Sequence, residues 1–236
     1  MKYYLFTQVS FIVLSAVCLV LIYFGLKSGL QNCSPETRNK VMRRFTLGML
    51  LWIGVLSVLS LSGFSSNFSA FPFNMMGVLI PPVIFLIFLT RSSSTTDILS
   101  HLDPRKLVYI QSFRIPVEIL LWLLFLDNLT PVQMTFEGRN FDILVGITAL
   151  LAAPLFFQKG NLNWKWAIGW NVFGMILLMN ILTIAILSFP TPFRYFMNEP
   201  ANTQVTQFPI IFLPGILVPI AYYMHVLSIK QILILK

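Results

Sequence analysis

Long apolar runs restrict the fold of this chain more than any other feature of its sequence. Seven stretches of about 17 to 23 residues are each long enough to cross roughly 30 Å of hydrocarbon, because a helix rises about 1.5 Å per residue. They cover residues 4–26, 45–63, 73–90, 107–126, 142–158, 166–188 and 208–229. We therefore predict an all-α integral membrane protein, with a single seven-helix transmembrane domain over residues 1–236.

The composition supports this prediction. Of the 236 residues, 57% are hydrophobic and 10% are charged, which leaves too little polar surface to cover a soluble domain of this size. The first run continues from Tyr4 to Leu26 and no A-x-A cleavage site follows it, so it predicts a membrane helix instead of a signal peptide. The two cysteines, Cys18 and Cys33, predict no disulfide framework.

Basic residues are distributed unevenly between the predicted loops. Twelve fall on one side of the membrane and three on the other, while Arg114 lies inside a span. The twelve are Lys27, Arg38, Lys40, Arg43, Arg44, Arg91, Arg105, Lys106, Lys159, Lys165, Lys230 and Lys236, and the three are Lys2, Arg139 and Arg194. The positive-inside rule then predicts that the N-terminus is outside and the C-terminus is cytoplasmic, and we expect a bacterial cytoplasmic (inner) membrane. The net charge of +8 follows from this bias; it suits contact with membrane lipid and does not indicate nucleic acid.

The third and seventh spans share a short pattern. Each begins with Phe-Pro and continues to a Gly-x-Leu-x-Pro core, in which Gly77 and Pro81 correspond to Gly215 and Pro219. This pattern predicts a parallel 3+1+3 repeat with the fourth helix as linker, and the alternative is a chance match between apolar helices. Proline lacks the amide that a helix needs, so these helices are expected to kink. The kinks either face a cavity or improve packing.

Polar residues interrupt the fourth span, where an ionisable side chain costs about 2.5 to 3.5 kcal/mol. Gln111, Arg114 and Glu118 follow an i, i+3, i+7 spacing, which places them on one face of the helix. We interpret this face as the wall of a substrate or ion path. In that role Glu118 can be proton-coupled and Arg114 can bind an anion. The alternative is a structural ion pair of Arg114 and Glu118 with each other or with a neighbouring helix.

A second group of charges lies in the connection before the fifth span. The stretch MTFEGRNFD, residues 134–142, contains Glu137, Arg139 and Asp142, and Asp127 lies across the same loop. These four residues predict an outer mouth that acts as a substrate gate. Their spacing is not diagnostic of a cation site, so we assign no metal. The alternative is an ordinary solvated loop.

Polar side chains also occur in the last two spans. Asn171 and Asn180 are expected to hydrogen-bond to another helix or to line the substrate site. His225 lies toward the cytoplasmic end of its helix, and its pattern favours a packing histidine over a proton relay.

Several chemistries lack the residues that they need. With only two histidines, the chain has no pair of haem ligands within the bundle and no multi-histidine zinc site. A Gly-x-Ser-x-Gly elbow and a DxxxD pair are also absent, so the sequence disfavours an enzyme and indicates no cofactor.

The predicted helix order resembles that of the rhodopsin-like bundles and of the SWEET and PQ-loop sugar carriers, whose plan is also 3+1+3. The resemblance covers the helix order and no motif. A retinal protein needs a lysine midway along the last helix, whereas this last helix has only Lys230 at its edge. The Pro-Gln signature of the carriers is absent, and the charged face lies on the helix that is the linker in those proteins.

We therefore expect a small-molecule carrier or channel, with substrate bound between helices near the midplane at Gln111, Arg114 and Glu118. The sequence leaves open the substrate, the coupling ion and the oligomeric state. One alternative is a non-catalytic receptor or assembly partner that binds through its outer loops. Another is a membrane enzyme that acts on lipid at the outer mouth.

Overall fold

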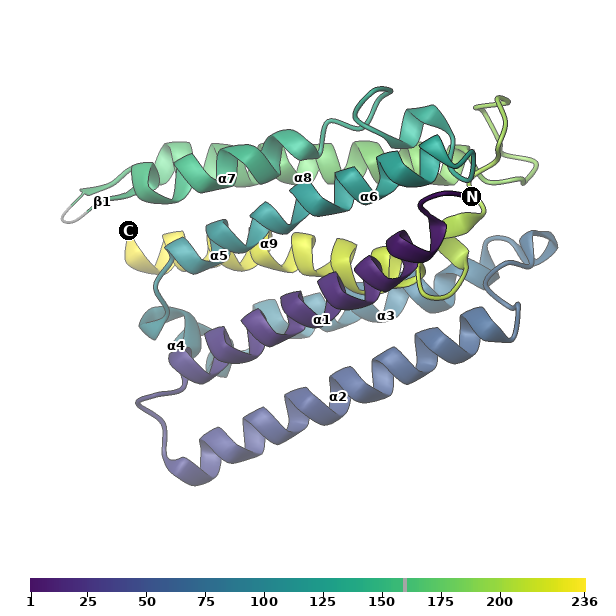
Figure 1. Ribbon diagram of the computed structural model, residues 1–236. Coiled ribbons are helices and arrows are strands. Elements are labelled where there is room, and N and C mark those ends of the chain that lie inside the picture. The colour runs from purple at the N-terminus through teal and green to yellow at the C-terminus, as the bar shows by residue number, and fades with distance from the viewer. Residues whose placement is uncertain (159–160) are drawn as a thin grey trace.

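The structure is a computed structural model that describes residues 1–158 and 161–236, and it is almost entirely helical (Figure 1). Its α-helices are α1 (Tyr4–Gly29), α2 (Pro35–Leu61), α3 (Phe73–Arg91), α4 (Ser93–His101), α5 (Arg105–Tyr109), α6 (Arg114–Leu126), α7 (Ile143–Phe156), α8 (Trp164–Leu187) and α9 (Val218–Leu235). Short elements connect them. They are the 3-10 turns η1 (Phe68–Ala70), η2 (Ile110–Phe113), η3 (Val132–Met134) and η4 (Gln204–Thr206), the π-turn η5 (Leu213–Leu217), and a small hairpin of β1 (Phe157–Gln158) and β2 (Asn161–Leu162).

Within the described residues, six helices are long and apolar enough to cross a membrane. They are α1, α2, α3, α8, the helix Arg105–Leu126 that joins α5, η2 and α6, and the helix Leu213–Leu235 that joins η5 and α9. The protein is therefore an all-helical, membrane-embedded protein. The remaining predicted span, 142–158, corresponds to α7, whose 14 residues reach only about 21 Å. The seven-span topology with the N-terminus outside stays a prediction.

The second helix begins ten residues before the predicted span 45–63. Ser34 caps its first turn, because the Ser34 hydroxyl accepts a hydrogen bond from the Thr37 amide at 3.3 Å. Pro35 occupies the first helical position, where its missing amide costs nothing. Hydropathy did not detect this polar beginning of the helix, since it lies ahead of the apolar run.

Two helices form the centre of the bundle and the others surround them. Helix α9 packs against α8, α3, α4 and α5, and α6 packs against α1 and α7. Helix α2 lies at the edge of the bundle (Figure 1) and is mostly exposed. Both the N-terminus and the connections 127–142 and 188–212 lie at one end of the bundle, which we call the N-terminal end. This is the end that the positive-inside rule predicts to be outside.

The carbonyl that Pro219 leaves free in the last helix receives a donor from α2. Pro219 has no amide, which leaves the carbonyl of Gly215 without its usual helical donor. The indole Nε1 of Trp52 donates to that carbonyl at 2.8 Å, and the hydroxyl of Tyr223 donates to the carbonyl of Pro82 at 2.5 Å. Gly215 lies in the π-turn η5, whereas the matching Gly77 lies in a regular α-helix, so the proposed repeat stays a prediction.

Candidate functional site

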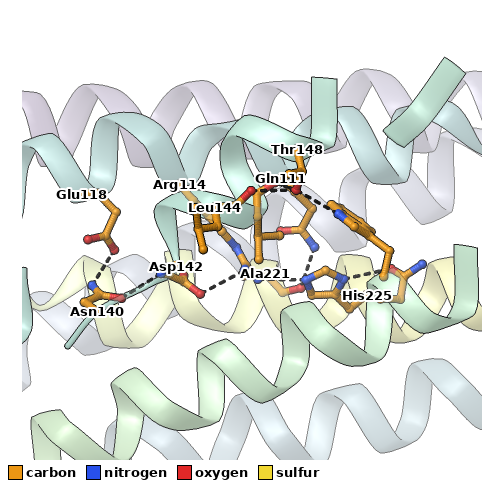
Figure 2. Close-up of polar contacts among 12 residues, drawn as sticks. Gln111, Arg114, Glu118, Asn140, Asp142, Leu144, Thr148, Ala221 and His225 are labelled. Carbon is orange, nitrogen blue, oxygen red and sulfur yellow. Dashed lines mark hydrogen bonds and ion pairs between the residues drawn. The ribbon is translucent and has the colours of Figure 1, made fainter. Parts of the chain in front are cut away.

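The three polar residues of the fourth span lie on the buried face of the helix Arg105–Leu126 (Figure 2). Gln111 is 0% exposed, and Arg114 and Glu118 are each 1% exposed. Arg114 is nine residues from Arg105 and twelve from Leu126, so it lies about 14 Å and 18 Å from the two ends of the helix. The side chains therefore meet near the middle of the bundle.

Arg114 forms its ion pair with Asp142 and not with Glu118. Its Nη1 donates to Oδ1 of Asp142 at 3.1 Å. Asp142 directly precedes α7, where the free amides of the first turn favour a negative charge. Gly146 lets α7 approach this closely, because a Cβ atom there would lie 3.0 Å from the backbone nitrogen of Ile115 and 3.3 Å from Cβ of Arg114. The residue that the sequence placed at an outer mouth thus lies in the centre of the bundle.

His225 of α9 is the second partner of Arg114. Nη2 of Arg114 lies 3.0 Å from Nε2 of His225, and because a guanidinium can only donate, this ring nitrogen accepts. The proton of the ring is therefore on Nδ1, which donates to Oδ1 of Asn171 at 2.8 Å. Asn171 in turn donates to the hydroxyl of Ser228 at 3.1 Å. Gly174 of α8 makes room for the imidazole, since a side chain at this position would overlap the His225 ring.

Glu118 has a partner for only one of its two carboxyl oxygens. Nδ2 of Asn140 donates to Oε1 at 2.6 Å, and Oδ1 of Asn140 accepts from the amide of Asp142 at 3.1 Å (Figure 2). Among the residues that the structure describes, nothing pairs with Oε2 of Glu118 or with Nε of Arg114. Gln111 donates to the carbonyl of Ala221 at 3.1 Å, which ties the same face to α9.

The connection 127–142 carries Asn140 and Asp142 into the bundle. Thr130, Thr135 and Asn140 are 0% exposed, so these side chains of the segment point into the bundle, while Glu137 and Arg139 are exposed. Gly138 is required for its close path, because a Cβ atom there would overlap the carbonyl of Val132. The segment turns back from the N-terminal end of the bundle, and this path explains why α7 is short.

The other predicted residues lie apart from this centre. The carboxylate of Asp127 accepts from the amides of Lys2 and Tyr3 at 2.7 Å each, so it caps the beginning of α1. Glu137 is exposed and accepts from the indole of Trp122 at 2.8 Å.

Arg139 and Asn180 also lie at the N-terminal end of the bundle. The guanidinium of Arg139 lies 5.4 Å from the centre of the Phe196 ring. Asn180 of α8 donates to the carbonyl of Arg139 at 2.9 Å. Of the four residues predicted to form an outer mouth, only Asp142 joins the buried centre.

A cavity of about 70 Å³ lies beside the buried centre. In the described part of the chain, three charged residues line it, Arg114, Glu118 and Asp142, and the rest of its wall is almost entirely apolar. Leu178 of α8, Leu217 of η5 and Phe189 of the 188–212 connection belong to this apolar wall. One water needs about 15 Å³, so the cavity has room for a few waters or for a small solute.

The sequence did not predict the partners of the central charges. It gave no role to Asn140 or Ser228, and it favoured a packing role for His225. One signal was present: His225 and Ser228 are spaced i, i+3, so they share a helical face in the same way as Gln111 and Arg114. The contact of Arg114 with Asp142 gave no signal, because it depends on the path of the 127–142 connection.

Comparison with known proteins places the chain in a family. A family model described as a domain of unknown function, DUF8737, matches residues 72–233. No curated protein and no solved structure matches. The matched region begins just before α3 and contains every residue of the buried centre. The chain therefore belongs to the DUF8737 family.

Proposed function

We propose that the protein is a carrier of a small molecule, which binds in the central cavity against Glu118. The observation that supports this most strongly is the unpartnered Oε2 of Glu118, a side chain on the wall of a cavity in the middle of the bundle. A buried polar atom without a partner costs about 1 to 3 kcal/mol, and more when the group is charged. A bound solute would supply the missing partner.

The position of the cavity supports a carrier that alternates between two states. The cavity extends from the central charges toward Phe189 and Val205, which lie at the N-terminal end. In the opposite half, Gln231 of α9 donates to the carbonyls of Leu99 and Leu102 at 2.6 Å each and so joins α9 to the segment around α4. A cavity that reaches the central charges from one end of the bundle is one of the states expected for alternating access.

The π-turn η5 is a suitable hinge for the change between these states. Leu213, Pro214 and Leu217 belong to this turn and line the cavity. π-turns are rare and occur often at functional sites, because they interrupt the regular hydrogen-bond ladder. A rearrangement at η5 would therefore reshape the cavity directly.

The buried centre favours this proposal over the two alternatives. A receptor that binds through its outer loops needs no cavity beside buried charges. A lipid-acting enzyme at the outer mouth would need Glu137 beside Asp142, yet Glu137 is exposed and bonded to Trp122 while Asp142 is paired with Arg114.

Accessibility of a cysteine in the cavity wall tests the proposal. Cys18 and Cys33 are first replaced by alanine and serine, and Leu178→Cys is then introduced on α8. A membrane-impermeant methanethiosulfonate is applied to right-side-out and to inside-out vesicles. A carrier exposes this cysteine to both sides in turn, so labelling is expected in both preparations.

A matched variant controls for non-specific entry of the reagent. Leu124 is buried and lies nearer to the end of its helix, but it does not line the cavity. Leu124→Cys is therefore expected to stay unlabelled. If Leu178→Cys is labelled from neither side in folded protein, the carrier proposal is wrong.

A further inference from the structure

We propose that the cavity binds a small organic ammonium ion, whose charged group contacts Oε2 of Glu118 and whose apolar body lies against Leu178 and Leu217. This inference rests on the proposed carrier function and names the class of its substrate.

The charges on the cavity wall are unbalanced in favour of a cation. Among the residues that the structure describes, Arg114 is the one basic residue that lines the cavity, and its Nη1 is engaged by Asp142 at 3.1 Å. Glu118 has no ion pair within the described parts of the chain. When both acids are ionised, the buried centre carries a net charge of −1. An uncompensated buried charge is costly, so Glu118 holds either a proton or a bound cation.

An anionic ligand does not fit the same site. Both terminal nitrogens of Arg114 are engaged, one by Asp142 and the other by His225. An anion would add a second negative charge to a guanidinium that Asp142 already neutralises, and Glu118 lines the same cavity.

The wall suits an organic cation better than a metal ion. Among the described residues, no group of three or more His, Cys, Asp and Glu side chains could hold a metal. Hard metal cations need about six oxygen ligands, whereas an ammonium group needs only a few acceptors. The apolar wall contributed by Met75, Leu178 and Leu217 then accommodates a hydrocarbon chain.

The size of the cavity limits the length of that chain. Its volume of about 70 Å³ is far below the roughly 300 to 1,000 Å³ of sites for drug-sized ligands. A short amine such as n-butylammonium is therefore a suitable probe.

Binding of the cation is coupled to release of a proton. The charged groups that act on Glu118 are Arg114 of the same helix and Asp142 before α7, and Arg114 is in turn near His225 and Tyr222 of α9. Arg114 is balanced by Asp142, so only one further positive charge is needed at Glu118. An ammonium ion that binds to protonated Glu118 therefore displaces one proton into solution.

Calorimetric titration of the purified full-length protein with n-butylammonium tests the inference. Saturable binding is expected, with about one proton released per cation bound in a weakly buffered solution with a pH indicator. Glu118→Gln is expected to weaken binding at least tenfold and to abolish proton release. Glu137→Gln is the matched control, because Glu137 is exposed and lies outside the cavity; its binding is expected to be unchanged.

A second variant keeps all the charges and fills the cavity. Leu178→Trp adds bulk to the apolar wall, so it is also expected to weaken binding at least tenfold. Uncharged n-butanol is expected to bind at least tenfold more weakly than the cation. Equal binding of n-butylammonium to wild type and Glu118→Gln, or tighter binding of n-butyrate, would overturn the inference.

The experiments separate this inference from the carrier proposal. If Leu178→Cys is labelled from both sides but n-butylammonium does not bind, the carrier proposal stands and the ligand class is wrong. If n-butylammonium binds as expected but the cysteine is labelled from one side only, the ligand class stands and the protein is not a carrier.

Discussion

The central helices and α2 differ in a way that apolar composition does not reveal. More than half of the residues in the apolar parts of Arg105–Leu126 and Leu213–Leu235 are buried, against 6% in α2. Yet the apolar part of α2 is the most hydrophobic of these three apolar parts. Lipid is as apolar as leucine, so a purely apolar helix gains little by leaving it. Polar side chains, which cannot be satisfied in lipid, identify the helices of the centre.

The same comparison shows what holds the centre together. Gln111, Arg114 and His225 join the two central helices through hydrogen bonds, while α2 contacts the centre through a few groups such as Trp52. Substitutions in the two regions should therefore have different effects on stability.

Loss of Arg114 should have the largest effect. Arg114→Met would leave Asp142 buried without its partner and would remove the donor to His225. Removal of one member of a buried ion pair typically costs about 3 to 5 kcal/mol. Thermal unfolding in detergent should show a large fall in Tm. Arg43→Met in the exposed part of α2 is the matched control and should leave Tm unchanged. Equal falls in Tm for the two variants would contradict the difference between the central helices and α2.

Glycine-to-alanine substitutions should have opposite signs in the two regions. A methyl group at Gly174 would overlap the His225 ring and force the imidazole away from Arg114, at a cost of about 1 to 3 kcal/mol. At Gly54 of α2 there is open space, so alanine should stabilise the helix by about 0.5 to 1 kcal/mol. The two Tm values, measured in one detergent, check both signs. A fall in Tm for both variants would mean that another part of the protein packs against α2 at Gly54.

Trp52 should have a smaller effect than Arg114 or Gly174. Trp52→Phe removes the donor to the Gly215 carbonyl but keeps an aromatic ring, so we expect a loss of about 1 kcal/mol. Trp166 is 76% exposed, and Trp166→Phe should leave the unfolding free energy unchanged. If Trp52→Phe lowers the unfolding free energy more than Gly174→Ala does, α2 belongs to the centre.

Much of the helix order could be predicted from the sequence, because an apolar run long enough to cross a membrane records its own position. The predicted spans 73–90 and 166–188 lie within two residues of α3 and α8 at each end. The beginning of α2 could not be predicted in this way, since its polar turns precede the apolar run. The predicted span 142–158 also lies within two residues of α7 at each end, but hydropathy reports composition and could not predict the path of the 127–142 connection.

The candidate site could be predicted only along one helix. The i, i+3, i+7 spacing indicated a shared inward face, and Gln111, Arg114 and Glu118 are all buried. Their partners Asn140 and Asp142 arrive from a connection that turns into the bundle, and spacing along the chain does not encode such a contact. The roles of these residues in binding stay a proposal.

Reaction of Glu118 with a hydrophobic carbodiimide tests the central claim most directly. Dicyclohexylcarbodiimide adds to protonated carboxyl groups in apolar surroundings, and mass spectrometry of peptides locates the adduct. We predict modification at Glu118 and not at Asp142, whose carboxylate is held by Arg114, with at least tenfold slower reaction in the presence of n-butylammonium. An unmodified Glu118, or an equal rate with and without n-butylammonium, would contradict the account.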